Sequence, residues 1–136
     1  MSIRFDDLIR EGLCFYHNGE YSESVKRFTE AIQINPEDFK PYLYRARSTW
    51  DTYNNIHERT LYGEFYDDYQ KVLKLDPSNV EAHIALGNYT YHAYEIGSHD
   101  SIEIPLNYYY DVCELDDKCT QGYIGRAIIC YDIGIY

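Results

Sequence analysis

Hydrophobic residues recur along the chain at helical spacing in short segments, which predicts an all-α protein. In the first segment, Leu8, Gly12 and Phe15 share one helix face at i, i+4 and i+7. Asn18–Gly19 is a turn signal, because glycine tolerates a positive φ. A second apolar stripe then follows, made of Val25, Phe28, Ala31 and Ile32. Residues 5–38 therefore predict two amphipathic helices joined by a short turn, an αα-hairpin.

Three similar stretches separate the amphipathic segments at a nearly constant spacing. Pro36 and Pro77 are 41 residues apart, and Asp117 follows Pro77 by 40. The residue before a proline is biased away from the helical region, so helices are expected to end at these stretches. A fixed period in this range is typical of stacked repeats, whose function usually lies on a continuous binding surface. The stretches are INPED (34–38), LDPSN (75–79) and LDDKC (115–119).

The first hairpin has the length and residue order of a known repeat. Residues 5–38 number 34, and large, small and aromatic positions follow one another in a fixed order. These positions are Leu8, Gly12, Phe15, Gly19, Tyr21, Ser24, Phe28, Ala31 and Pro36. The order resembles the tetratricopeptide repeat. The resemblance implies an all-α solenoid of antiparallel helix pairs in a right-handed superhelix, with seven helices in about three and a half repeats. We expect one domain, 1–136, with repeats 5–38, 39–79, 80–119 and a partial repeat 120–136.

The second and third repeats exceed 34 residues by seven and six. Seven residues are close to two helical turns, so we expect longer helices in both repeats and not a long loop. Turn-like residues lie at Asn54–Asn55 and at 97–100, and Pro105 is expected in the first turn of a helix. Small residues at equivalent positions are expected at close helix contacts: Gly12, Ala46, Gly87 and Ala127.

The resemblance also implies a binding surface, because the first helix of each tetratricopeptide pair lines a concave groove. An aliphatic row, Ile9, Leu43, Ile84 and Ile124, is expected beside an aromatic row, Tyr16, Trp50, Tyr91 and Tyr131. Aromatic side chains are good anchors for peptides, although this family also uses them for packing alone. The full set of expected groove residues is Ile9, Arg10, Leu13, Tyr16, Lys40, Leu43, Tyr44, Arg47, Trp50, Ile84, Asn88, Tyr91 and Ile124.

Three basic residues on this surface, Arg10, Lys40 and Arg47, offer a carboxylate-binding spot. The alternative is ordinary pairing with Asp6, Asp7 or Asp51 of the same chain. Tetratricopeptide domains that bind the acidic C-terminal tails of heat-shock chaperones use a clamp of Lys, Asn and Arg. None of the five matching positions carries the clamp residue, which excludes that co-chaperone function: Ile9, Leu13, Tyr44, Glu81 and Ala85.

Composition narrows the function further. The 23 acidic and 12 basic residues give a net charge of −11, which argues against nucleic acid, whose binding requires basic residues. We expect no membrane span, since no apolar stretch is long enough, and a cytoplasmic location, since the N-terminus lacks the pattern of a signal peptide. The spacing of Cys113 and Cys119 is no common zinc spacing, so no metal or cofactor is expected. Catalytic motifs are absent, and we expect no enzyme.

The end of the sequence is unusually apolar. Residues 123–136 contain only two charged residues, Arg126 and Asp132. Exposed apolar patches often form interfaces, so we expect a homodimer through Tyr123, Ala127, Ile128 and Tyr131. In the alternative, residues 132–136 fold back over their own helix or into the groove.

Two functions follow from these patterns. The first is a non-enzymatic scaffold or adaptor that binds a protein or peptide in the concave groove. The alternative is a small dedicated chaperone or antidote that masks one partner, because class II chaperones of type III secretion are similar in size, acidity and repeat number.

Overall fold

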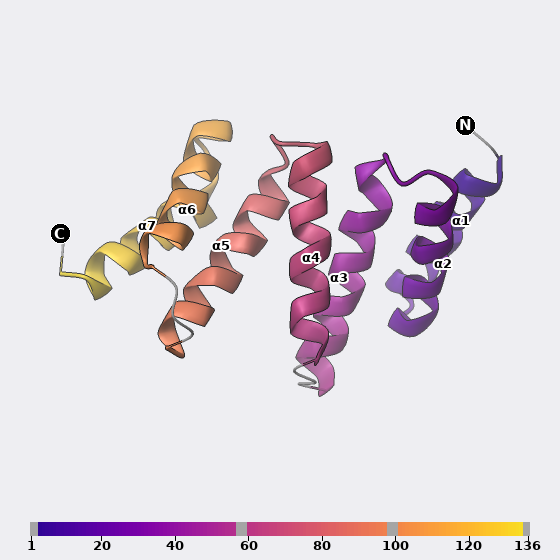
Figure 1. Cartoon of the computed structure of the whole chain (residues 1–136), viewed down its shortest axis with the longest axis horizontal. Coiled ribbons are helices and arrows are strands. Elements are labelled where there is room, and N and C mark those ends of the chain that lie inside the picture. The colour runs from indigo at the N-terminus through magenta and orange to yellow at the C-terminus, as the bar shows by residue number, and fades with distance from the viewer. Residues whose placement is uncertain (1–2, 57–59, 98–100, 135–136) are drawn as a thin grey trace. The chain divides into compact units, whose positions relative to one another are not determined.

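The computed structural model describes the backbone of residues 3–56, 60–97 and 101–134. Over these ranges it consists of α-helices without strands, so the all-α prediction is confirmed. Figure 1 shows the helices, of which α1, α2, α4, α5 and α6 end at or near turns expected from the sequence. They are α1 (Ile3–His17), α2 (Tyr21–Ile34), α3 (Phe39–Ile56), α4 (Thr60–Leu75), α5 (Val80–Glu95), α6 (Glu103–Leu115) and α7 (Thr120–Asp132).

Contacts divide the chain into two compact units, which are described separately. The first unit is Met1–Pro77, with α1 to α4, and the second unit is Ser78–Tyr136, with α5 to α7. The single domain expected from the sequence stays a prediction. None of the helices in the described ranges is long and apolar enough to cross a membrane.

The first unit consists of two hairpins, α1 with α2 and α3 with α4, in which α2 also packs on α3 (Figure 1). Its core contains Leu8, Phe28 and Ala31, all fully buried. Gly12 allows α1 to approach α2 closely, because a Cβ at this position would lie 2.5 Å from Phe28 Cε1. Between α2 and α3, the buried Ser24 hydroxyl donates a hydrogen bond to Ser48 Oγ at 2.8 Å.

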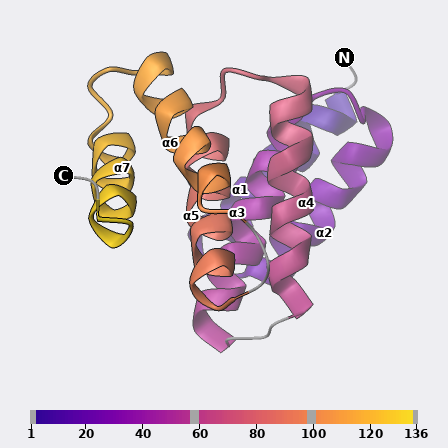
Figure 2. The same ribbon diagram turned by 60° about the vertical axis from the view of Figure 1, so that its left-hand side comes forward.

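In the second unit α5 and α6 form a hairpin, and α7 packs mainly on α6 (Figure 2). Tyr109 of α6 is the central side chain of this packing. A Cβ on Gly87 of α5 would lie 2.8 Å from Tyr109 Cε1, and a Cβ on Gly125 of α7 would lie 2.6 Å from Tyr109 Cδ1. The buried tyrosine ring therefore requires a glycine on both neighbouring helices.

The extra residues of the second and third repeats behave differently. In the second repeat α3 and α4 have 18 and 16 residues, against 15 and 14 in the first hairpin, so the expected lengthening is confirmed. The expected turn at Asn54–Asn55 is wrong, because these residues are part of α3. The other end of that connection, residues 57–59, lies outside the described residues.

In the third repeat the expectation of longer helices is wrong, since α5 has 16 residues and α6 only 13. The physical reason lies at the two helix ends. Gly97 has φ +76°, a conformation that ends α5 and that glycine adopts without strain. At the start of α6, the Glu103 N–H donates to Ser101 Oγ at 3.1 Å, and Pro105 lies in the first turn as expected. The turn expected at 98–100 lies outside the described residues.

The expected small-residue contacts are confirmed for Gly12, Ala46 and Gly87, which are all buried. For Ala127 the expectation is wrong, because this residue is exposed. The buried residues of α7 are Gly122, Gly125 and Ile129. They lie on the opposite side of the helix, which packs on α6, and no described element of the second unit covers Ala127.

Candidate functional site

The expected binding surface in the first unit lies on α1 and α3, the first helices of the two hairpins. Ile9, Leu13 and Tyr16 share one face of α1 at i, i+4 and i+7. The Tyr16 hydroxyl donates a hydrogen bond to Asp51 Oδ2 of α3 at 2.6 Å. This bond shows that Tyr16 of α1 and Asp51 of α3 lie on the sides of these helices that are turned towards each other.

The second unit contains the same bond at equivalent positions. The Tyr91 hydroxyl of α5 donates to the Asp132 carboxylate of α7. Tyr16 and Tyr91 are both the twelfth residue of their repeats, and Asp51 and Asp132 are both the thirteenth residue of the next first helix. We call these two bonds the Tyr–Asp cross-links. Each joins successive first helices, so Tyr16 and Tyr91 of the expected aromatic row also have a structural role.

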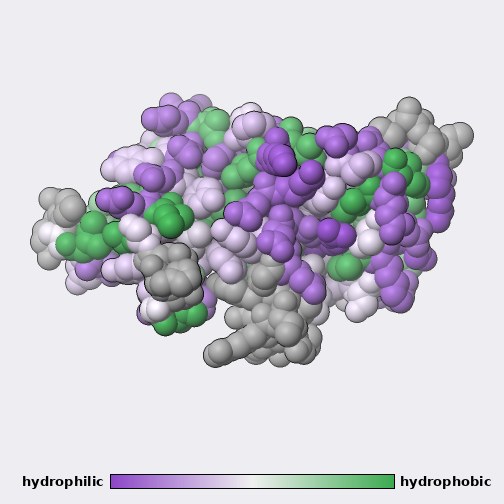
Figure 3. Space-filling view, viewed as in Figure 1, coloured by the Kyte–Doolittle hydropathy of each residue, from purple (hydrophilic) through white to green (hydrophobic). Residues whose placement is uncertain are grey.

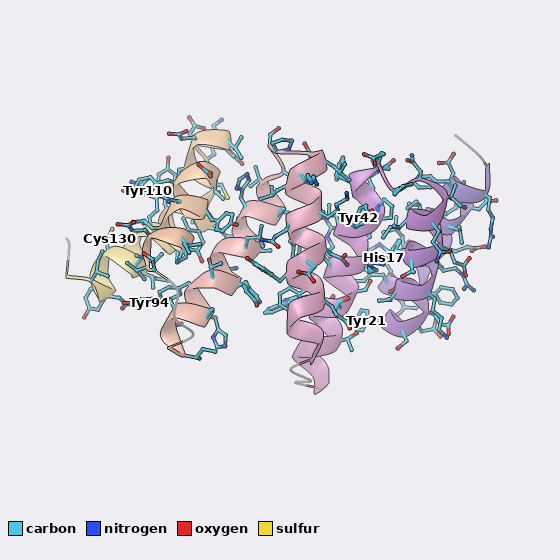
Figure 4. All side chains as sticks on the ribbon, in the orientation of Figure 1. His17, Tyr21, Tyr42, Tyr94, Tyr110 and Cys130 are labelled. Carbon is cyan, nitrogen blue, oxygen red and sulfur yellow. The ribbon has the colours of Figure 1, made fainter. Side chains whose placement is uncertain are left out.

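Neither cross-link was expected from the sequence, which named Asp51 only as a partner for a basic residue. The signal that could have found them is an acid directly after the aromatic position of the following repeat, as in Trp50–Asp51 and Tyr131–Asp132. Near the first cross-link, the Tyr16 ring also contacts His17 and Tyr21 at centroid distances of 5.5 and 5.6 Å, and both partners are labelled in Figure 4. These contacts fix the orientation of the Tyr16 ring.

Burial and the hydrogen bond to Asp51 raise the pKa of Tyr16 to about 12. Burial also raises the pKa of Tyr109 to about 12, and its hydroxyl donates to Asn88 Oδ1 at 2.5 Å. A phenol with a raised pKa stays neutral in the folded chain while the unfolded chain ionises. The stability it contributes is therefore complete below about pH 10 and is lost as the pH rises through 12.

This difference predicts a late step in the ionisation of the tyrosines. Followed by absorbance near 295 nm, part of the phenol ionisation is expected only near pH 12, against about 10 for an ordinary tyrosine. Tyr16→Phe is expected to reduce this late fraction. An unchanged late fraction in Tyr16→Phe would show that the cross-link to Asp51 is not formed in solution.

The three basic residues of the expected surface have different surroundings. Arg10 pairs with Asp7 at 2.9 Å with both side chains exposed, which is the ordinary pairing that was the alternative; such surface pairs contribute little. The Arg47 guanidinium lies over the Tyr44 ring, 5.3 Å from its centroid, and the Tyr44 ring packs on Phe28. The charge of Arg47 also acts on Tyr16. Lys40 is exposed near the start of α3.

The apolar residues of the surface also differ in how accessible they are. Leu43 is only 6% exposed, and Ile9 packs against the core cluster of Phe5, Leu8 and Ala31. Trp50 is 38% exposed, and its ring contacts Phe65 of α4 edge-on at 5.0 Å between centroids. The first unit therefore offers Trp50 and parts of Ile9 and Leu13 to a ligand. The expected proximity of Trp50 to Tyr91 involves both units and stays a prediction.

In the second unit, Ile84 and Tyr91 are half-buried on α5, and Asn88 is exposed while it accepts the bond from Tyr109. Ile124 of α7 is 52% exposed. The expected residues thus lie on the two helices that the second Tyr–Asp cross-link joins.

Comparisons with known proteins identify the fold. No model of a protein family matches the chain. The first tetratricopeptide domain of Spaghetti (RPAP3), bound to the HSP90 peptide SRMEEVD, superposes with a TM-score of 0.76 at 16% identity and covers 98% of this chain and 96% of that one. MamA superposes with a TM-score of 0.77 at 15% identity, covering 98% and 66%. The chain has the tetratricopeptide-repeat fold.

Relatives among curated proteins agree with this tetratricopeptide identification, which is thereby confirmed. Human tetratricopeptide repeat protein 6 is 26% identical over 122 residues, which are 90% of this chain and 22% of that protein. A DnaJ homolog subfamily C member 7 homolog of Schizosaccharomyces pombe is 26% identical over 80 residues, 54% of this chain and 17% of that protein. The chain therefore spans about a fifth of the length of these relatives.

A further feature of the first tetratricopeptide unit was not expected from the sequence. Arg45 of α3 donates to both carboxylate oxygens of Asp68 of α4, at 2.7 and 2.8 Å, and to Thr29 Oγ1 of α2 at 3.1 Å. These groups line a cavity of about 380 Å³ together with Val25, Thr49, Glu64 and Asp67. The hydrogen bonds to Asp68 raise the pKa of Arg45, so the guanidinium is charged.

The Arg45 cluster had no clear signal in the sequence, because its partners are 16 and 23 residues away on two other helices. Burial raises the pKa of Asp68, and the bonds from Arg45 oppose this effect. With both of its oxygens bound by one arginine, Asp68 is not placed to transfer a proton to a ligand. Among the described residues, no group of three His, Cys, Asp or Glu side chains could bind a metal ion.

Proposed function

We propose that the chain is a non-enzymatic tetratricopeptide scaffold that binds a segment of another protein on the face of its first helices. The observation that carries the proposal is the surface of α1 and α3 on the side of the Tyr16–Asp51 bond. Trp50 remains partly exposed on α3, Leu13 is half-buried on α1, and Lys40 is exposed near the start of α3. A surface that combines an aromatic anchor with aliphatic and basic groups is common among peptide-binding sites.

Solved structures with this fold support a peptide as the ligand. The Spaghetti domain is bound to an HSP90 peptide, and the TPR2B domain of yeast Sti1, 21% identical with a TM-score of 0.69, is in complex with an Hsp70 peptide. The proposed contact residues are those derived from the repeat pattern: Ile9, Arg10, Leu13, Tyr16, Lys40, Leu43, Tyr44, Arg47, Trp50, Ile84, Asn88, Tyr91 and Ile124.

The chemistry of this surface favours a different peptide from those two. The five positions of the chaperone-tail clamp carry Ile9, Leu13, Tyr44, Glu81 and Ala85, and none of these side chains can donate a charged hydrogen bond to a terminal carboxylate. The proposed ligand is an internal segment with a large apolar side chain against Trp50 and Leu13. Lys40 is ten residues before Trp50 on the same helix, about 15 Å away along the axis, so an acidic residue of the ligand at roughly that distance from the apolar side chain would interact with Lys40.

The test begins with capture of the partner from the source organism and continues with measured affinities. Trp50→Ala and Lys40→Glu are each expected to weaken binding at least about tenfold, or about 1.4 kcal/mol. Tyr110→Ala on α6 and Lys74→Glu on α4 are matched controls at exposed sites on second helices, and binding is expected to be unchanged. Circular dichroism would check that each variant is folded.

Two outcomes would contradict the proposal. If Trp50→Ala and Lys40→Glu bind the captured partner as well as the original chain does, the partner lies on another face. If the HSP90 peptide SRMEEVD binds tightly, the proposed difference in ligand chemistry is wrong. A single captured partner that is insoluble without this chain would favour the dedicated chaperone or antidote. The cytoplasmic location stays a prediction.

A further inference from the structure

The second unit has a more apolar surface than the first. Of twelve exposed large hydrophobic residues among the described side chains, ten lie between Tyr94 and Ile133. Four of these are on α7, where Tyr123, Ile124, Ile128 and Tyr131 are 46, 52, 46 and 72% exposed. Figure 3 shows part of this hydrophobic surface in green over the C-terminal helix. A cluster of this kind on one helix usually belongs to an interface.

The exposed residues of α7 form one continuous stripe. Tyr123, Ile124, Ala127, Ile128 and Tyr131 recur at i, i+1, i+4, i+5 and i+8, opposite the buried Gly122, Gly125 and Ile129. We call these five residues the α7 stripe. At the position of Ala127, each of the three other first helices has a buried small residue: Gly12, Ala46 and Gly87. Gly12 and Gly87 pack closely against the second helix of their hairpin. This side of the repeat is therefore one that the fold otherwise covers.

The α7 stripe is also uncharged in a strongly acidic chain. The two charged residues of α7 are both in contact with the second unit itself. The Arg126 guanidinium lies 4.1 Å from the centre of the Tyr110 ring of α6, and Asp132 accepts the hydrogen bond from Tyr91. Figure 4 labels Tyr110 on α6 and Cys130 on α7. With a net charge of −11 per molecule, an uncharged face is where two copies can approach with the least repulsion.

We propose that the α7 stripe is a homodimer interface, in which a second copy of this chain covers it with its own α7, antiparallel about a two-fold axis. The order of residues along the stripe fits such an axis. If the axis passes between Ala127 and Ile128, each small Ala127 meets the large Ile128 of the partner subunit. Ile124 then meets Tyr131 of the partner subunit. Small against large side chains allow two helices to pack closely, and the same patch serves both copies, as a two-fold interface requires.

Sedimentation over a range of micromolar concentrations tests the proposal. The full chain is expected to show a monomer–dimer equilibrium, and Ile128→Glu is expected to raise its Kd at least tenfold, because a charge would be buried at the axis. Ile34→Glu is the matched control, since Ile34 on α2 is 44% exposed against 46% for Ile128. The dimer is also expected to tighten with added salt, which screens the repulsion between two acidic molecules.

A cross-linking experiment tests the arrangement of the two helices. In a chain whose Cys14, Cys119 and Cys130 are replaced by serine, Ala127→Cys is expected to form a disulfide-linked dimer under mild oxidation. Ser22→Cys, at an exposed position of α2, is the control, and this variant is expected to remain without a disulfide-linked dimer. Its cross-linking to the same extent would overturn the two-fold arrangement.

Three results would overturn the dimer. They are a monomer at every concentration, a dimer whose Kd is unaffected by Ile128→Glu, and a dimer that weakens as salt is added. A monomer that also binds no hydrophobic dye would show that the stripe is covered by the chain itself, as in the alternative in which residues 132–136 fold back. None of these results depends on peptide binding by α1 and α3. Ile124 is the one residue that both proposals use, so in a dimer the peptide would contact the other proposed groove residues.

Discussion

Replacing Asp68 by alanine is expected to lower the free energy of unfolding of the first unit by about 3 kcal/mol. The substitution removes the acceptor of two hydrogen bonds from Arg45, at 2.7 and 2.8 Å. The Arg45 side chain is only 24% exposed, so its charge would remain largely buried with no carboxylate hydrogen-bonded to it. Among the described residues, Thr29 would still accept a hydrogen bond from the guanidinium, the Tyr42 ring would lie 5.9 Å away, and the charge of Glu64 would still act on it. Urea unfolding followed by circular dichroism measures the loss.

Two further variants separate the charge effect from a simple loss of packing. Asp67→Ala, on the adjacent exposed acid of α4, is the matched control and is expected to change stability by less than about 0.5 kcal/mol. The double variant Arg45→Met with Asp68→Leu is expected to recover most of the loss, because an apolar pair needs no desolvation of charge. A loss in Asp68→Ala no larger than in Asp67→Ala would show that the Arg45–Asp68 pair does not stabilise the unit.

The helices and the contacts that were predicted correctly from the sequence involve residues within one helix or within one helical hairpin. Hydrophobic periodicity and the turn residues placed the helices, and the spacing of Leu8, Gly12 and Phe28 placed the first hairpin. The repeat then transferred the same register to Gly87, whose contact with Tyr109 is equivalent to that of Gly12 with Phe28. Contacts of this kind can be predicted from the sequence because equivalent residues make them in each of these two hairpins.

The features that the sequence missed depend on which helices become neighbours. Arg45 reaches α2 and α4 at once, and Tyr16 reaches an acid 35 residues away. The predicted helix lengths in the third repeat were wrong because Gly97 ends α5, so the extra residues of this repeat lie between α5 and α6 and not within the helices. The predicted close contact at Ala127 was wrong because the repeat pattern indicates which side of a helix a residue lies on, but not whether another element packs against that side.

The two Tyr–Asp cross-links connect the fold to the proposed function. Each joins successive first helices within one unit, α1 to α3 and α5 to α7. The bonds therefore limit how far the proposed binding helices can separate, so the surface is already formed in the absence of a ligand. A preformed surface binds more tightly, since less order has to be created on binding. In this view Tyr16 and Tyr91 contribute to binding mainly by positioning the helices.

Replacing Gly87 by leucine is expected to destabilise the second unit by about 1–3 kcal/mol, since the core at this point has no room for a side chain. A Cβ alone would lie 2.8 Å from Tyr109 Cε1. Tyr109 cannot move far, because Gly125 of α7 lies equally close on another side and the hydroxyl is bound by Asn88. Gly87→Ala is expected to cause a smaller loss, which Tyr109 can partly accommodate by tilting.

The matched control for this prediction is Glu95→Leu, which adds the same side chain to an exposed position of α5 and is expected to leave the midpoint of thermal unfolding nearly unchanged. In Gly87→Leu the midpoint is expected to fall by several degrees, and the contact of α7 with α6 is expected to loosen, because Tyr109 packs against both glycines. Hydrogen exchange would show the loosening as faster exchange in α7. An unchanged midpoint would mean that Gly87 does not face α6, and the register of the third repeat would be wrong.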